Sequence, residues 1–311
     1  MALFLSNDDI RRLLPMRECV EVLDDLFRQE ARGLVDNRPR QRLRFPDSSF
    51  TATLMGGTVL GSEAHGIRHS SATLLYNTTT GKLDAVLEPN LLALIRTGAA
   101  SAVAAKYMSR PDASVLGVFG TGRQAVTQVE GICAVRPLSL VKVYSRNEEN
   151  RVRFAEQMRE RMGIEIVPVG TPEECVRGSH IVVTITSATE PVFDGALLEP
   201  GTHVIAAGVN SWMKREVDET TIRRAQVLAV DNLEQAKQEC GELIWAAERG
   251  AFRWTRAVEL HEVVSGRVNG YPSPGTITLF ESQGIGTEDV AASAYVLKKA
   301  RAAGMGIELP F

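Results

Sequence analysis

The segment 114–125, Ser-Val-Leu-Gly-Val-Phe-Gly-Thr-Gly-Arg-Gln-Ala, constrains the fold of this chain more than any other feature. An apolar run leads into a glycine turn, and residues 124–135 then follow a helical pattern. Gly120 permits a tight turn, Gly122 lets the backbone approach a pyrophosphate, and Ala125 lets the helix pack closely on the strand. The N–H groups and dipole of the helix would face the phosphates. The segment therefore predicts a dinucleotide-binding βαβ unit.

Short β-rich runs alternate with helical patterns around this segment. The strands that we expect are 114–119, 140–144, 164–169, 180–186, 203–208 and 226–230. Such alternation is typical of a parallel sheet with helices on both faces. We therefore expect an α/β fold in which residues 113–287 form a Rossmann-type, doubly wound parallel sheet.

Residues 1–112 follow a different pattern. Helical patterns cover 7–14 and 16–33, strand-like runs cover 38–45, 50–55, 72–77 and 83–87, and an Ala- and Leu-rich helix covers 91–108. The last two strand-like runs read as a hairpin. The final amphipathic helix, 288–303, has no place in the doubly wound sheet. We therefore expect a first α+β domain of residues 1–112 that is completed by residues 288–311.

Composition excludes several classes of protein. The 311 residues carry a formal net charge of −3 without a long basic run, so nothing indicates nucleic-acid binding. No apolar stretch is long enough to cross a bilayer, and the acidic N-terminus does not read as a signal peptide. The four cysteines lie far apart without paired spacing, which argues against a metal site or disulfide framework. A cytoplasmic protein with reduced thiols is expected.

The end of the strand 140–144 indicates which nucleotide binds. An Asp or Glu about 20 residues past the glycines normally holds the ribose 2′-hydroxyl of NAD. Here Ser145, Arg146 and Asn147 occupy this position. A carboxylate would repel a 2′-phosphate, whereas a guanidinium pairs with it. The sequence therefore favours NADP(H), with NAD(H) possible; the alternative is that Arg146 is only a solvated charge at a strand end.

Four arginines alternate perfectly along the first strand-like run: Arg38, Arg40, Arg42 and Arg44. In a regular strand all four would project from one face. Guanidinium groups gathered on one face must be met by water or by an anion such as a carboxylate ligand. The alternative interpretation is an edge strand whose charges prevent unwanted pairing.

Arg96 lies on the apolar stripe of the helix 91–108, together with Leu92, Ala99, Ala100 and Val103. An arginine there is costly unless it meets an acid or a bound anion. A substrate carboxylate, a cofactor phosphate or an internal Asp or Glu would each serve. We expect the ligand, so replacing Arg96 by leucine should leave the protein folded and reduce its activity.

The chain resembles the ornithine cyclodeaminase/mu-crystallin family over essentially its whole length. The segments that carry the resemblance are 94–101, 117–125, 214–218 and 276–284 with the preceding Ser273-Pro274. The resemblance implies a Rossmann domain between two parts of a split substrate-binding and dimerisation domain, and hence a homodimer. Members include ornithine and lysine cyclodeaminases, alanine dehydrogenases and reductases of cyclic ketimines. All move a hydride between a nicotinamide and the carbon that joins an amine or imine to a carboxylate.

The resemblance also assigns roles to residues. Arg96 falls on the arginine that binds the substrate carboxylate, and Arg40 or Arg42 falls near a second one. The cofactor contacts that we expect are Thr97, Gly120, Thr121, Gly122, Arg123, Gln124, Ser145, Arg146, Asn147, Thr186 and Val209.

Two candidate catalytic positions depart from the family pattern. Arg68 stands where the family usually has a lysine, and Asn210 stands where cyclodeaminases and alanine dehydrogenases have an aspartate. Arg68 keeps a positive charge beside the substrate but cannot give up a proton at ordinary pH. Asn210 could order substrate or water but could not act as an acid or base. Ornithine cyclisation needs proton handling as ammonia leaves, so both changes argue against it.

Reduction of an already protonated imine requires mainly hydride placement and carboxylate binding. The function that we expect is therefore that of an NADP(H)-preferring imine reductase or amino-acid dehydrogenase acting on a small imino or amino acid. One alternative is an ornithine cyclodeaminase or alanine dehydrogenase. Another, from a different class, is a nucleotide-dependent ligand-binding protein of the mu-crystallin type.

Overall fold

The computed structural model describes residues 1–44 and 51–310, which form two compact units. Unit 1 consists of Met1–Arg96 and Ile285–Phe311, and unit 2 consists of Thr97–Gly284. These bounds differ from the expected 1–112, 113–287 and 288–311, because the chain divides within helix α3 (Pro89–Met108) rather than after it. The second part of α3 belongs to unit 2, where Gly98 lies directly against the backbone of Thr127.

Unit 2 is built on an eight-stranded parallel sheet with the order β13-β12-β14-β11-β10-β7-β8-β9. The strands are β7 (Val115–Phe119), β8 (Leu140–Tyr144), β9 (Glu165–Pro168), β10 (Ile181–Thr184), β11 (His203–Ala206), β12 (Val227–Val230), β13 (Ala257–Glu259) and β14 (Thr278–Glu281). The chain runs outward from β7 through β8 to β9 and then returns to the other side of β7 with β10. This reversal is the topological switch point at which such sheets bind ligands, and it confirms the expected Rossmann-type fold.

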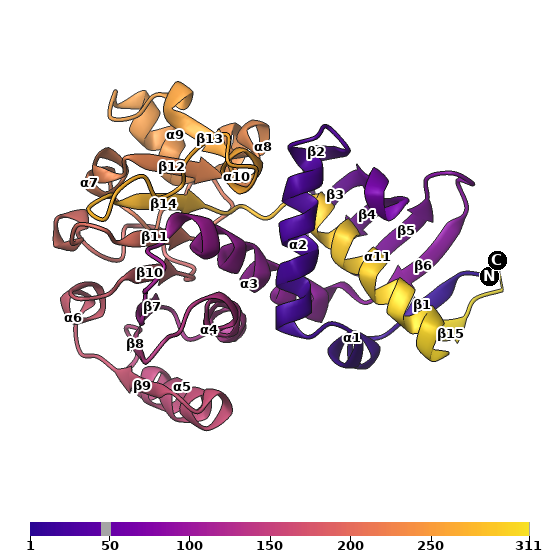
Figure 1. Ribbon diagram of the computed structural model, residues 1–311, viewed down its shortest axis with the longest axis horizontal. Helices are drawn as coiled ribbons and strands as arrows, with labels where there is room; N and C mark the ends of the chain where they lie inside the picture. Colours follow the sequence, from indigo (N-terminus) through magenta and orange to yellow (C-terminus); the bar gives the residue numbers. More distant parts are fainter. Residues whose placement is uncertain (45–50, 311) are drawn as a thin grey trace. The chain divides into compact units, whose positions relative to one another are not determined.

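Helices lie on both sides of this sheet (Figure 1). They are α4 (Arg123–Val135), α5 (Glu148–Met162), α6 (Pro172–Val176), α7 (Glu219–Arg224), α8 (Leu233–Glu239), α9 (Gly241–Glu248) and α10 (Leu260–Val264). Asn147, Thr171, Asp218 and Asn232 accept hydrogen bonds from the first turns of α5, α6, α7 and α8, which fixes where these helices begin. The strands between the helices bury both faces, as the fully buried β10, β11 and β14 show.

Unit 1 contains a seven-stranded mixed sheet with the order β15-β1-β6-β5-β4-β3-β2. Its strands are β1 (Leu3–Leu5), β2 (Val35–Arg44), β3 (Thr51–Val59), β4 (Ala64–His69), β5 (Thr73–Asn77), β6 (Leu83–Leu87) and β15 (Ile307–Glu308). Its helices include α1 (Asn7–Leu13), α2 (Met16–Glu30) and α11 (Gly286–Ala303), and α11 packs against β3, β4 and α2. Residues 64–69 are not among the strand-like runs expected from the sequence. The structure makes them strand β4, because β3 and β5 pair with them on both sides.

A bulge in β2 corrects the expectation that its four arginines share a face. Arg38 pairs with Gly56 of β3, whereas Arg42 pairs with Thr53 after a register shift. Alternate residues of β3 point to opposite faces, so Arg38 lies on the face opposite to Arg42 and Arg44. Arg40, at the bulge, is the buried member of the four.

None of the described helices combines the length and the apolar character that a membrane crossing requires.

Candidate active site

The glycine turn in unit 2 has the geometry of a phosphate-binding loop. Gly120 has a φ of +117°, and a Cβ there would lie 2.5 Å from the carbonyl oxygen of Ile185. Gly122 immediately precedes α4, and no side chain of the described residues caps this helix. A Cβ on Gly122 would meet nothing within 4 Å. The first turn of α4 thus lacks a capping side chain among the described residues, which leaves its N-terminus suited to binding a pyrophosphate. Ala125 is buried behind the turn.

The other residues expected at this turn differ in exposure. Arg123 is exposed, Thr121 and Gln124 are half-buried, and Thr97 on α3 is buried. The carbonyl oxygen of the Gln124 side chain is buried and has no hydrogen-bond partner among the described residues. These positions fit a nucleotide, since they combine an accessible cation with polar atoms beside an open helix end.

The residues after β8 form a tight turn that presents Arg146. Ser145 Oγ donates a hydrogen bond to the carbonyl oxygen of Asn147, at 2.8 Å. The Asn147 side chain caps α5 by accepting from the backbone N–H of Asn150, also at 2.8 Å. The side chains of Ser145 and Asn147 thus shape the turn, whereas Arg146 is exposed. Of these three residues, only Arg146 has a side chain without a hydrogen bond or ion pair among the described residues.

A buried glutamate that the sequence reading missed joins the ends of β10 and β11. Glu216 Oε1 accepts from the backbone N–H of Thr186 at 2.6 Å, and its Oε2 accepts from the N–H of Gly208 at 2.7 Å. Val209, which follows Gly208 in the chain, is buried, and Asn210 is exposed. The signal was present in the family-like segment 214–218, which places a carboxylate close after the end of a parallel strand.

In unit 1, internal acids meet Arg96. Arg96 Nη1 lies 2.7 Å from Glu288 Oε2, and its Nε lies 3.3 Å from Asp289 Oδ1. Both acids are fully buried in the first turn of α11, where the helix dipole also favours carboxylates. Burial lowers the pKa of Arg96, but Asp289 and Glu288 raise it, and the net shift is upward. In the structure Arg96 thus pairs with internal acids, one of the alternatives that the sequence left open, and its contact with a substrate carboxylate stays a prediction.

Arg68 shares one of these acids. Its Nε lies 3.4 Å from Asp289 Oδ1, so a single carboxylate oxygen lies between the two guanidinium groups. Asp289 raises the pKa of Arg68, while burial and Arg96 lower it, with a net downward shift. The Arg68 side chain is 21% exposed, against 6% for Arg96. Arg68 is therefore the more accessible cation of the pair.

Unit 2 buries a second cluster of charged groups, Glu216, Glu242, Glu281 and Cys240. The backbone N–H of Glu216 donates to Glu242 Oε1 at 2.8 Å, and Cys240 Sγ lies 3.6 Å from Glu281 Oε2. Burial raises the pKa of Glu242 to about 7 and that of Glu281 well above its usual range. Within the described residues, no lysine or arginine forms an ion pair with these glutamates. Burial thus favours the protonated form of the Glu242 and Glu281 carboxyls.

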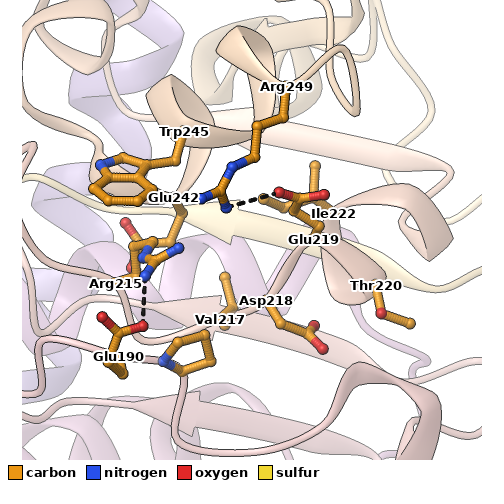
Figure 2. A pocket seen from close by; sticks show the side chains of 11 residues that line it. Glu190, Arg215, Val217, Asp218, Glu219, Thr220, Ile222, Glu242, Trp245 and Arg249 are labelled. Atoms are coloured by element: carbon orange, nitrogen blue, oxygen red, sulfur yellow. Dashed lines mark hydrogen bonds and ion pairs between the residues drawn. The ribbon is translucent and has the colours of Figure 1, made fainter.

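A cavity of about 300 Å³ opens beside this cluster (Figure 2). Glu242, Trp245, Arg215 and Arg249 belong to its lining, and the Arg215 guanidinium lies 4.1 Å from the centre of the Trp245 ring. Both arginines are already paired with lining acids, Arg215 with Glu190 and Arg249 with Glu219. None of the residues predicted for the site lines this cavity, so we do not assign the substrate to it.

Comparisons with known proteins agree with this geometry. A Delta(1)-pyrroline-2-carboxylate reductase of Bacillus cereus is 31% identical over 325 residues, which cover 99% of this chain and 100% of the relative. The structure of the Thermococcus litoralis Delta(1)-pyrroline-2-carboxylate reductase in complex with NADH and L-proline matches with a TM-score of 0.94 and 31% identity, covering 99% of this chain and 100% of that one. An archaeal alanine dehydrogenase dimer with bound NAD matches with a TM-score of 0.92 and 29% identity, covering 100% and 99%.

The sequence model of one family spans nearly the whole chain. It matches residues 1–304 and thus includes both units, from β1 to the end of α11. The resemblance noted on the glycine turn and on the segments around Arg96 and Glu216 is therefore confirmed over the full length. This chain belongs to the ornithine cyclodeaminase/mu-crystallin family.

Proposed function

We propose that this protein is an NAD(P)H-dependent oxidoreductase that reduces the C=N bond of a small imino acid. The observation that carries the proposal is the pair of departures at positions 68 and 210. Arg68 is a partly exposed cation held by a buried acid, and Asn210 is an exposed amide. Neither side chain exchanges protons at ordinary pH, so these two positions suit charge binding and orientation rather than acid–base chemistry.

Separate groups of residues bind the cofactor and the substrate. When bound, the reduced nicotinamide supplies the hydride, and a substrate imine that is already protonated accepts it to become an amine. Gly120, Gly122 and the open end of α4 hold the pyrophosphate. Arg96, with Arg40 or Arg42 of β2, binds the substrate carboxylate, and Arg68, which shares Asp289 with Arg96, adds a positive charge beside it.

A substrate panel tests this proposal. NADPH and NADH consumption is measured with five- and six-membered cyclic imines that carry a carboxylate and with the same rings that lack it. Arg68→Met is expected to lower kcat/KM for the carboxylated imines by roughly 30-fold to several-thousand-fold, because a partly desolvated charge contact is worth about 2–5 kcal/mol. Arg68→Lys keeps the charge and should retain part of the activity. Arg38→Met, an exposed arginine on the opposite face of β2, is the matched control.

Three results would contradict the assignment. An equal loss for rings with and without the carboxylate would show that Arg68 does not bind that group. Rapid release of proline and ammonia from ornithine would favour a cyclodeaminase. Tight imine binding without any oxidation or reduction would favour a ligand-binding protein.

The cofactor preference is a finer part of the proposal. The exposed Arg146 follows β8 where an acid would select NAD(H), so we expect NADP(H) to bind more tightly. Arg146→Asp should reduce the ratio of NADPH to NADH affinity by about 10- to 100-fold, the value of a charge-assisted hydrogen bond. Arg153→Asp on α5 makes the same change of charge away from the β8 turn and should leave the ratio unchanged. Tighter binding of NADH by the unaltered protein would refute the preference.

The assembly and location also belong to the proposal. We expect a homodimer, as for the alanine dehydrogenase noted above, and light scattering on the purified protein would measure its mass. A cytoplasmic location is supported by four free cysteines, which form no disulfide among the described residues.

A further inference from the structure

We propose that Glu216 is a positioning residue that fixes the ends of β10 and β11 where the nicotinamide half of the cofactor binds. The inference rests on dinucleotide binding as proposed above, and it concerns unit 2 alone. Glu216 follows β11 and precedes α7, and its side chain is fully buried.

One carboxylate joins two strand ends through three donors. Oε1 accepts from the N–H of Thr186 at 2.6 Å, while Oε2 accepts from the N–H of Gly208 at 2.7 Å and from Thr184 Oγ1 at 3.1 Å. Thr184 is the last residue of β10, Thr186 lies just beyond that strand, and Gly208 lies just beyond β11. Because backbone N–H groups approach both oxygens, the ionised carboxylate satisfies all three donors at once.

Packing shows how closely the two ends are held. A Cβ on Gly208 would lie 2.4 Å from the backbone of Thr186 and 2.5 Å from Glu216 Oε2. Position 208 therefore admits only glycine while the carboxylate lies between the two segments. A change in the length or hydrogen bonding of the Glu216 side chain must move at least one strand end.

Topology places these strand ends on the nicotinamide side. The sheet order β11-β10-β7-β8 puts β8, which ends before Arg146, on one side of the glycine turn and puts β10 and β11 on the other. A dinucleotide bound across the carboxyl ends of this sheet has its adenosine ribose at β8. Its nicotinamide half then faces the ends of β10 and β11, where Thr186 and Val209 lie.

The position of Glu216 is itself fixed by the backbone. Its N–H donates to Glu242 Oε1 at 2.8 Å, and its carbonyl oxygen accepts from the N–H of Val192 at 2.9 Å. Burial raises the pKa of the Glu216 carboxyl, and the hydrogen bonds from Thr186, Gly208 and Thr184 oppose this rise. The glutamate is thus held at its backbone and uses its side chain to hold its neighbours.

Binding of two probes tests the inference. NADH contains the nicotinamide, whereas ADP-ribose contains only the other half of the molecule. Glu216→Gln keeps the shape of the side chain but presents an NH₂ group to one of the backbone N–H donors. We expect it to weaken NADH binding by about tenfold, through one lost buried acceptor, and to leave ADP-ribose binding within about twofold. Glu216→Asp keeps the charge with a shorter reach and should give a smaller loss for NADH.

Asp218→Asn is the matched control, because Asp218 also accepts backbone N–H groups but uses them to cap α7 and to hold Gly195. It should change neither affinity. Equal weakening of both probes in Glu216→Gln and Glu216→Asp, or wild-type NADH affinity in both, would overturn the role of Glu216. Failure of the unaltered protein to bind either probe would instead overturn the cofactor proposal. Thermal unfolding checks that each variant is folded. If Glu216→Gln does not fold, the NADH and ADP-ribose affinities of Glu216→Asp test the inference.

Discussion

In unit 1 the two buried carboxylates of α11, Glu288 and Asp289, meet two arginines, whereas in unit 2 the buried carboxyls of Glu216, Glu242 and Glu281 meet none among the described residues. The first cluster balances two positive charges against two negative ones. In the second cluster the carboxyls accept hydrogen bonds from backbone N–H groups, a hydroxyl and a thiol, and burial favours their protonated forms. Both solve the same problem, since an uncompensated buried charge is strongly unfavourable.

The difference teaches which conditions each cluster tolerates. Arginine remains charged at any ordinary pH, so the Arg68–Arg96 cluster is sensitive to the loss of a partner but hardly to pH. A carboxyl that is buried without a cation keeps its proton to higher pH, so the glutamate cluster responds to pH instead. Substitutions that remove a charge and titrations that remove a proton should therefore separate the two clusters.

The largest effect is expected when Arg96 is replaced by leucine. The change removes the ion pairs of Arg96 with Glu288 and Asp289, and breaking a buried ion pair costs about 3–5 kcal/mol. Urea denaturation would measure the loss. The sequence predicted that this variant stays folded, and the buried acids add the expectation that it is less stable. Unchanged stability would mean that the acids do not depend on the arginine.

A smaller effect is expected from pH through Glu242. Burial raises the pKa of Glu242 to about 7 from a reference value of 4.5, so the folded protein binds this proton more tightly than the unfolded chain. The resulting stability is fully present below pH 4.5 and is lost as pH rises through 7, with a slope of at most about 1.4 kcal/mol per pH unit.

Glu242→Gln removes this titration, so the stability of that variant should vary less between pH 5 and 8 than that of the unaltered protein, by about 1–3 kcal/mol. Denaturation curves at several pH values would show the difference. Parallel pH profiles for the two proteins would indicate that Glu242 is not the titrating group.

The smallest effect is expected at a half-exposed ion pair in unit 1. Lys299 Nζ lies 2.7 Å from Glu18 Oε2, and both side chains are about one third exposed. Lys299→Met should cost less than about 1 kcal/mol, and added salt should reduce even that difference. A loss of unfolding free energy as large as that of Arg96→Leu would show that the contribution of these ion pairs to stability does not depend on their burial.

Local patterns predicted the parts of the fold that local sequence determines. The expected strand 140–144 coincides with β8, and the glycine turn lies where 114–125 placed it. β14 was missed because its four residues end in Glu281, whose burial depends on β11 and β12 on either side. The faces of the β2 arginines were also missed, because a bulge reverses the alternation between Arg38 and Arg42.

The site shows the same limit. The apolar stripe around Arg96 correctly predicted that a negative group must meet it. Its partners, Glu288 and Asp289, lie 192 and 193 positions further along the chain, so no local spacing could identify them. Glu216 was missed for a related reason, since its donors come from two other strand ends.

The contrast between Gly120 and Arg146 has a consequence for how such a protein evolves. Gly120 has a positive φ and lies against the backbone of Ile185, so any side chain at this position strains the turn. Arg146 is exposed at the end of a turn that its two neighbours shape, so its codon can vary without a folding defect. Under the cofactor proposal above, a single substitution at Arg146 therefore changes the preference between NADP(H) and NAD(H) while the glycine turn keeps its backbone geometry.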